Sequence, residues 1–201
     1  MTMNRLVVIG GGEHACVVID AARANFHING FVDPQPCEET ARRFNIPRLD
    51  LDTKADKEIF VVLGIGESTK RRDLALRIAA MGLPWARVIH STAAVSQSAI
   101  IAAGTVVLAN AVVNTGASVG AHAIINSGAI VEHDVSIGAF THVAPGAVIG
   151  GGTSIGEGCM LGLGCRVRDH IRIGRNVVIG MGAVVVRDVP DHARVLGVPA
   201  K

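Results

Sequence analysis

The sequence predicts a mainly β protein in which a parallel β-helix follows a small α/β domain. Of its 201 residues, 49% are hydrophobic but only 3% are aromatic, and 24 are glycine. This aliphatic, glycine-rich composition is typical of β-structure. From Ile89 onward an aliphatic residue recurs at every sixth position, whereas the chain before it alternates apolar runs of strand and helix length. The expected domains are residues 1–86 for the α/β part and residues 87–201 for the β-helix with a short C-terminal tail.

Strands alternate with helices in the first 88 residues, which predicts a small parallel α/β unit. Glycine is a common residue just beyond a helix end, so Gly82 is expected to stop the last helix. Pro84 and Trp85 mark the junction with the second domain. The expected elements are a strand running into a glycine-rich turn (5–12), an apolar-striped helix (13–25), a strand ending in Asp33 (28–33), a third strand (57–66) and a charged amphipathic helix (67–82).

The second domain is predicted from seventeen consecutive aliphatic residues spaced six apart. An α-helix has a period of 3.6 residues and an open strand a period of 2, so neither explains a period of six. Three short strands per coil of eighteen residues do explain it, with one aliphatic side chain pointing inward on each face and small residues at the corners. Five to six stacked coils would bury a continuous aliphatic column. The aliphatic residues are Ile89, Val95, Ile101, Val107, Val113, Val119, Ile125, Val131, Ile137, Val143, Ile149, Ile155, Leu161, Val167, Ile173, Ile179 and Val185.

Charge and cysteine content exclude several classes of protein. A net charge of +2 argues against a nucleic acid as the main partner. No apolar stretch approaches the roughly 20 residues of a membrane span, and the N-terminal run is too short and glycine-rich for a signal peptide. The four cysteines follow no CxxC pattern, which favours a reduced, cytoplasmic protein.

The glycine-rich turn after the first strand predicts a phosphate-bearing ligand. Gly10, Gly12 and Ala15 formally fit the dinucleotide fingerprint, with Asp33 at a suitable distance. However, a Rossmann-like βαβ unit of 88 residues is too short for both halves of a dinucleotide fold. The pattern therefore favours a nucleotide-sugar site over an NAD site, and a purely structural turn is the remaining alternative.

The hexads resemble those of a known superfamily. In tandem they read [IV]-G-x-x-[small]-x from residue 89 to residue 190, which resembles the left-handed β-helix (hexapeptide-repeat) acyltransferases. The α/β domain beginning GGGEHACVVID (10–20) is similar to that of the bacterial sialic-acid O-acetyltransferase and nucleotide-4-amino-sugar N-acetyltransferase group. The resemblance implies a left-handed coil, acetyl-CoA as co-substrate, a nucleotide-sugar acceptor, a role in surface polysaccharide biosynthesis and a homotrimer with sites between subunits. It also implies nucleotide-sugar contacts at Gly12, Glu13, His14, Asp33 and Gly66.

Two histidines in the stretch VEHDVSIGAFTHV (131–143) are the main catalytic candidates. His133 and His142 are nine residues apart, which is half of an eighteen-residue coil, so they can meet only if His133 of one chain faces His142 of its neighbour. Acetyl transfer to an amine needs a base, and a neighbouring carboxylate can orient it. The resemblance implies that His133 is the general base and Asp134 its partner. Glu132 is expected on the other side of the strand.

The resemblance also implies where acetyl-CoA binds. It assigns His142, Leu163 and Met181 to the cofactor, the last two through backbone groups on one vertical line. Gly151 stacks on His133, where it is expected to leave room for the thioester and to offer its N–H to the oxyanion. Four arginines between Arg166 and Arg175 could meet the phosphates of coenzyme A, although a solvated face is the alternative.

Three alternatives remain open. One is O-acetylation of sialic acid or a related sugar. A second is a zinc enzyme with His122, His133 and His142 as ligands, as in some related β-helices, although no metal is expected. The third is a non-catalytic scaffold. Cys159 and Cys165 are expected in the core.

Overall fold

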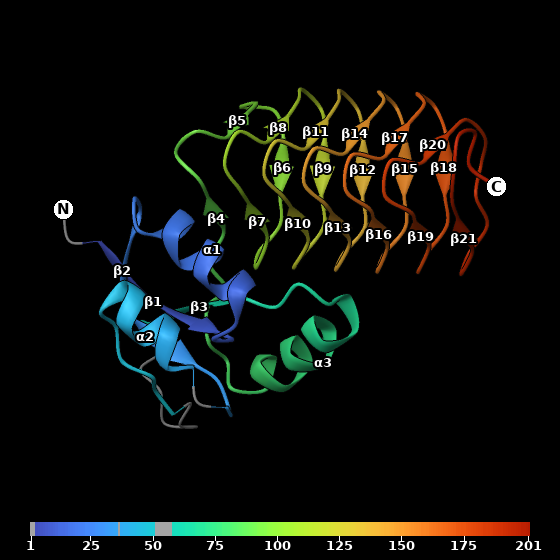
Figure 1. Cartoon of the computed structure of the whole chain (residues 1–201). Helices are drawn as coiled ribbons and strands as arrows, with labels where there is room; N and C mark the ends of the chain where they lie inside the picture. The colour runs from blue at the N-terminus through green and yellow to red at the C-terminus, as the bar shows by residue number, and fades with distance from the viewer. Residues whose placement is uncertain (1–2, 36, 51–57) are drawn as a thin grey trace.

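The computed structural model describes residues 3–35, 37–50 and 58–201 (Figure 1). A small α/β unit flanks the N-terminal end of a long β-helix, and the coils of the β-helix stack away from it toward the C-terminus (Figure 1). The predicted fold class is thereby confirmed. Among the described residues, no helix is both long and apolar enough to cross a membrane.

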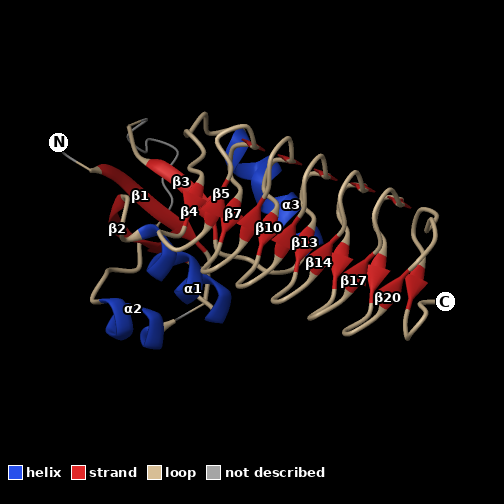
Figure 2. Ribbon diagram, turned by 90° about the horizontal axis from the view of Figure 1, so that it is seen from above, coloured by secondary structure: helices blue, strands red, loops and turns tan. Residues whose placement is uncertain are grey.

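The α/β unit is a three-stranded parallel sheet with the strand order β2-β1-β3. Alternate residues of the strands point to opposite sides of the sheet and pack into two separate cores, one beneath α1 and the other beneath α3. The two helices therefore cover opposite faces of the sheet (Figure 2). The short helix α2 was not predicted, because seven residues are too few to show a helical period. Lys57, at the start of the predicted third strand, lies outside the described residues. The elements are β1 (Asn4–Ile9), α1 (Glu13–Ala22), β2 (Phe26–Val32), α2 (Glu38–Phe44), β3 (Phe60–Leu63) and α3 (Ser68–Ala79).

The junction between the two parts extends the small sheet. Trp85 forms an isolated parallel bridge with Val61, and the Val61 N–H donates to the Pro84 carbonyl at 2.9 Å. The chain then enters the β-helix at Val88. The α/β unit and the β-helix are therefore joined along a strand edge as well as by side-chain packing.

Three parallel sheets, here called the first, second and third faces, form the β-helix. Strands pair with the strand eighteen residues further along, as Ile125 does with Val143, until the last coil, which is two residues shorter. The first face consists of β4 (Val88–Ile89), β7 (Val106–Val107), β10 (Ile124–Ile125), β13 (His142–Val143), β16 (Met160–Leu161), β19 (Val178–Ile179) and β21 (Arg194–Val195). The second consists of β5 (Ala94–Val95), β8 (Val112–Val113), β11 (Ile130–Val131), β14 (Val148–Ile149), β17 (Arg166–Val167) and β20 (Val184–Val185). The third consists of β6 (Ile100–Ile101), β9 (Ser118–Val119), β12 (Ser136–Ile137), β15 (Ser154–Ile155) and β18 (Arg172–Ile173).

The predicted aliphatic column forms the core of the β-helix. The second residue of each strand points inward and packs with the small residues four positions later, including Cys159 and Cys165, which are completely buried as predicted. Burying this apolar surface is the main force that holds the coils together.

The outward residues differ from face to face. On the first face Val88 and Val106 are buried under the α/β unit. Most outward residues of the second face are half-buried aliphatic side chains, and its exposed ones are Ala94 and Arg166. On the third face three serines stand between the exposed Ile100 and Arg172. The second face is therefore the more apolar of the two free faces.

Candidate functional site

His142 lies where the β-helix meets the α/β unit, and its surroundings select one tautomer. The Ser127 N–H donates to Oδ1 of Asn126 at 2.8 Å, so Nδ2 of Asn126 points at Nε2 of His142, 3.0 Å away. Nε2 must therefore accept, and Nδ1 carries the hydrogen, which it donates to the Gly66 carbonyl at 3.2 Å. Burial, aided by the nearby charge of Arg71, lowers the pKa of His142 to about 4. At neutral pH this imidazole is uncharged and cannot easily take up a proton.

Two predicted substrate residues share this site with His142. The ring of His14, in the first turn of α1, lies 6.0 Å from the ring of His142, and Gly66 follows β3. Burial lowers the pKa of His14 to about 4. Gly12 and Glu13 are exposed at the start of the same helix. The glycine-rich turn and the cofactor-side histidine are therefore neighbours within one chain.

Asp33 fastens the glycine-rich turn. Its carboxylate accepts from the Gly11 N–H at 2.7 Å and from the Gln35 N–H at 2.9 Å. Beside it, a cavity of about 570 Å³ opens at the carboxyl ends of the three strands, between Asp33, Ile65 and Arg77. This is where open parallel sheets bind nucleotides. A second hollow, of about 840 Å³, is lined by Gly12, Glu13 and residues of α1 and α2.

His133 and Asp134 lie at the corner between the second and third faces. Nδ1 of His133 is 2.9 Å from Oδ2 of Asp134, and this hydrogen bond raises the pKa of His133. Asp134 has a φ of 58°, a left-handed conformation that Asp tolerates. The side chain of His133 is 54% exposed in the single chain. Glu132 instead accepts a hydrogen bond from Asn114 at 3.0 Å.

Gly151 lies directly against the ring of His133. A Cβ at this position would stand 2.6 Å from Cε1 and Nε2 of His133. The absence of a side chain at Gly151 therefore lets the imidazole of His133 lie against the next coil, as the spacing of eighteen residues predicts.

Leu163 and Met181 form an exposed apolar edge at the corner between the first and second faces. Their side chains are 49% and 75% exposed, and the Gly182 N–H donates to the Leu163 carbonyl at 2.8 Å. The two residues therefore lie one above the other, as their spacing predicts.

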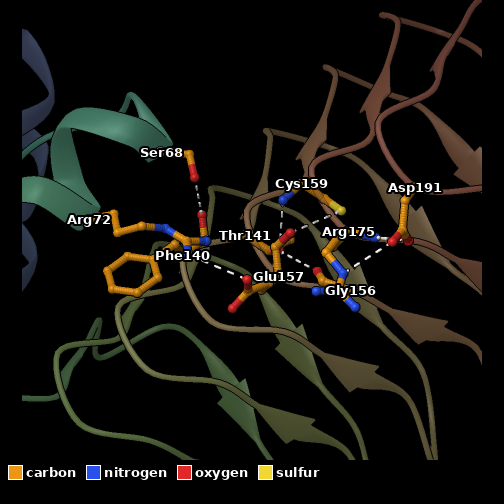
Figure 3. Close-up of polar contacts among 9 residues, drawn as sticks. All are labelled: Ser68, Arg72, Phe140, Thr141, Gly156, Glu157, Cys159, Arg175 and Asp191. Carbon is orange, nitrogen blue, oxygen red and sulfur yellow. Dashed lines mark hydrogen bonds and ion pairs between the residues drawn. The ribbon is translucent and has the colours of Figure 1, made fainter.

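The four arginines from Arg166 to Arg175 do not form one cluster. Arg166 points outward from the second face and Arg172 from the third, while Arg168 and Arg175 lie at the corners beyond these faces. Arg175 pairs with Asp191 at 3.1 Å (Figure 3). Ten residues span more than half a coil, so the sequence cluster is distributed around the β-helix.

Comparison with known proteins identifies the family of both parts of the chain. A family model described as the PglD N-terminal domain matches residues 5–78, and one described as bacterial transferase hexapeptide (six repeats) matches residues 128–163 and 152–187. The acetyltransferase domain of PglB from Neisseria gonorrhoeae, solved with acetyl coenzyme A, is 35% identical, with a TM-score of 0.90 over 99% of this chain and 98% of that chain. The chain belongs to the PglD-type hexapeptide-repeat acetyltransferases. The predicted family and the predicted acetyltransferase class are thereby confirmed.

Further structures support this assignment to the PglD-type acetyltransferases. PerB from Caulobacter crescentus, solved with CoA and GDP-perosamine, is 32% identical, with a TM-score of 0.84 over 98% of this chain and 95% of that chain. WeeI from Acinetobacter baumannii covers 100% of this chain and 99% of its own at 17% identity and a TM-score of 0.62, which shows the fold alone. A search of curated proteins found no match.

In this PglD-type acetyltransferase, His122 is packed between aromatic rings. Its ring stacks on Phe140 at 5.1 Å and meets the edge of Trp85 at 4.5 Å. Of the three histidines in the zinc alternative, His122 and His142 are buried and His133 is exposed at another corner. Within the described part of a single chain, no three His, Cys, Asp or Glu side chains gather as metal ligands.

Sequence reasoning missed the residue that ties this site together. Arg71, in the charged helix α3, is only 1% exposed and donates to carbonyl groups of both the α/β unit and the β-helix. The available signal was helical spacing, because Arg71 shares a helix face with the buried Ala75 and Ile78. Ser68 and Arg72 of the same helix also contact Phe140 (Figure 3).

Proposed function

We propose that the chain transfers the acetyl group of acetyl-CoA to the amine of a nucleotide-activated 4-amino-sugar, for surface glycan biosynthesis. The observation that carries this proposal is the meeting of His14 and Gly66 with His142. A sugar held by the glycine-rich turn of the α/β unit would reach the first face of the β-helix, where His142 lies. The gonococcal relative binds acetyl-CoA, and PerB binds CoA and GDP-perosamine.

The nucleotide half of the substrate fits the α/β unit. The cavity beside Asp33 has apolar walls for a base, and the N-terminus of α1 offers free backbone N–H groups to phosphates. A Cβ added at Gly12 would meet no atom within 4 Å, so a phosphate can approach the turn closely on that side. Gly12, Glu13, His14, Asp33 and Gly66 are therefore assigned to the nucleotide-sugar.

The complete site requires a trimer. The aliphatic second face is bordered by the His133 corner on one side and by the corner of Leu163 and Met181 on the other. Packing three second faces around a threefold axis would bury the aliphatic side chains and close the ring. The same packing would bring His133 of one chain beside Leu163, Met181 and His142 of the next. Acetyl-CoA is assigned to the groove between them.

His133 then acts as the general base. The sugar amine attacks the thioester carbonyl, Nε2 of His133 takes the proton from nitrogen, and CoA leaves as a thiol after protonation. Asp134 holds Nδ1 and stabilises the charged ring. The Gly151 N–H has no partner among the described residues and is assigned to the oxyanion. His142, uncharged with both ring nitrogens engaged, is a cofactor contact rather than a second base.

A substrate panel tests the proposal. Purified protein is assayed with acetyl-CoA for thiol release in the presence of UDP-, GDP- and dTDP-4-amino-sugars, including GDP-perosamine, and of sialic acid. We expect turnover with at least one amino-sugar and loss of that turnover in His133→Ala protein of unchanged size. Turnover with sialic acid alone would replace N-acetylation by O-acetylation. Stoichiometric zinc in active protein would overturn the metal-free mechanism.

A further inference from the structure

Arg71 is a buried cation held by carbonyl groups. Nε donates to the His122 carbonyl at 2.8 Å, Nη1 to the carbonyls of Ile65 at 3.0 Å and Gly66 at 2.8 Å, and Nη2 to the Phe140 carbonyl at 2.6 Å. Within the described residues no carboxylate pairs with it. A buried charge is costly, so an arginine placed here without a counter-ion indicates a specific task.

These contacts connect both halves of the site. Ile65 and Gly66 form the turn after β3 of the α/β unit, whereas His122 and Phe140 are corner residues of successive coils of the β-helix. The Gly66 carbonyl accepts from Arg71 and also from Nδ1 of His142. One guanidinium therefore sets the position of one of the two groups, the Gly66 carbonyl and the Asn126 amide, that select the tautomer of His142.

Phe140 has a backbone conformation at this corner that a bulky residue rarely adopts. Its φ of 59° lies in the left-handed region. Its carbonyl accepts from both Arg71 and the Ser68 hydroxyl, and the Arg72 guanidinium lies 4.9 Å from its ring (Figure 3). The same left-handed conformation recurs at every sixth residue from Gly104 to Gly182, at the corners of the β-helix, and Phe140 is the largest side chain among them. Phe140 is two residues from His142.

We propose that Arg71 is a positioning residue that locks the Gly66 turn to the Phe140 corner and so, together with Asn126, holds His142 in one tautomer and one orientation toward acetyl-CoA. The relevance to acetyl-CoA rests on the proposed function, whereas the effect on His142 does not. Lysine cannot replace this arrangement, because a single ammonium cannot reach four carbonyls that the planar guanidinium fork spans.

Nitrogen NMR of the histidine side chains tests the effect on His142 without any substrate. Protein labelled with 15N-histidine is compared at one neutral pH for wild type, Arg71→Gln, Arg71→Lys and the control Lys70→Gln, and the His142 signals are assigned by their loss in His142→Gln. Lys70 is an exposed basic residue of the same helix. We expect protonated Nδ1 and bare Nε2 in wild type and control, and averaged tautomers in both Arg71 variants. If Arg71→Gln does not fold, Arg71→Lys decides. Unchanged His142 signals in a folded Arg71 variant would overturn the proposal.

Kinetics then separate positioning from folding. For the folded Arg71 variants we expect kcat to fall on the order of 10–100-fold, since small misplacements of reacting groups have effects of this size. A rise in KM with unchanged kcat would contradict positioning. Absence of turnover in wild type would overturn the proposed function but leave the NMR result standing.

Discussion

The imidazole of His133 packs against Gly151 of the next coil, so closely that a methyl group there would stand 2.6 Å from Cε1 and Nε2. The ring of the candidate base thus lies against the backbone of Gly151, and Asp134 holds its Nδ1 by a hydrogen bond. A repeat of eighteen residues per coil places position 151 beside the candidate base.

Gly151→Ala is expected to displace His133. The added methyl group cannot share the space of the ring, so kcat/KM should fall on the order of 10–100-fold with little change in Tm. Steady-state kinetics measures the loss. Unchanged kcat/KM in folded Gly151→Ala protein would contradict a close packing of His133 on Gly151 in the working enzyme.

Asp134→Asn is expected to move the pH–rate profile. The hydrogen bond with Asp134 raises the pKa of His133, and a base is active only when deprotonated. Removing the carboxylate should therefore shift the acidic limb of kcat/KM to lower pH, while the maximal rate falls because the charged ring loses its partner. Asp169→Asn, an exposed acid elsewhere on the β-helix, should leave the limb in place. An unshifted limb in Asp134→Asn would contradict the assignment of His133 as base.

Trimer formation is expected to depend on the second face. Ile130 and Ser136 are outward residues of neighbouring faces in one coil. Ile130→Asp would place a charge in the proposed apolar interface and should give monomers in sedimentation analysis, with loss of turnover. Ser136→Asp is the matched control and should remain trimeric and active. Dissociation by the serine variant alone would assign the interface to the third face.

Stability should decline with acid in a defined range. Burial lowers the pKa of His14, His122 and His142 to about 4, below the unfolded value of 6.5. The unfolded chain therefore binds more protons between these values, so stability is full above pH 6.5 and is lost as pH falls toward 4, by about 3 kcal/mol for each histidine.

Denaturant unfolding at several pH values checks this. His122→Asn should reduce the slope of stability against pH between pH 4 and 6.5. The matched control is His170→Asn, because His170 is an exposed histidine with the same left-handed backbone, at a φ of 54° against 56° for His122. Asn tolerates that backbone in both cases. An equal slope in both variants would exclude His122 as a source of the acid sensitivity.

The fold was largely predictable because each hexad carries its own signal. An inward aliphatic residue such as Val143 needs no knowledge of distant segments, so periodicity alone gave the coils and the stacking of Leu163 on Met181. The α/β unit followed from strand and helix patterns. The exception, α2, is too short to show a period, and it contributes Thr40 and Phe44 to the wall of one hollow.

The site was predictable only where stacking or resemblance supplied it. Spacing placed Gly151 beside His133, but it could not show how closely the ring lies against the glycine. The contacts of Arg71 join segments more than fifty residues apart and run to backbone carbonyls, which have no sequence signature. Likewise, the arginines near residue 170 were close in sequence and yet are spread over different faces, because the chain turns between them.

Subunit complementation tests the central claim, that each site combines His133 of one chain with the acetyl-CoA groove of the next. One inactive variant is His133→Ala, and the other is Leu163→Glu with Met181→Glu, which places acids on an exposed apolar edge where acetyl-CoA is expected. After co-refolding in equal amounts, random trimers should contain about one quarter of their sites with both halves intact. We predict recovery of about a quarter of wild-type turnover from two inactive proteins. No recovery from well-mixed trimers would contradict a site shared between chains.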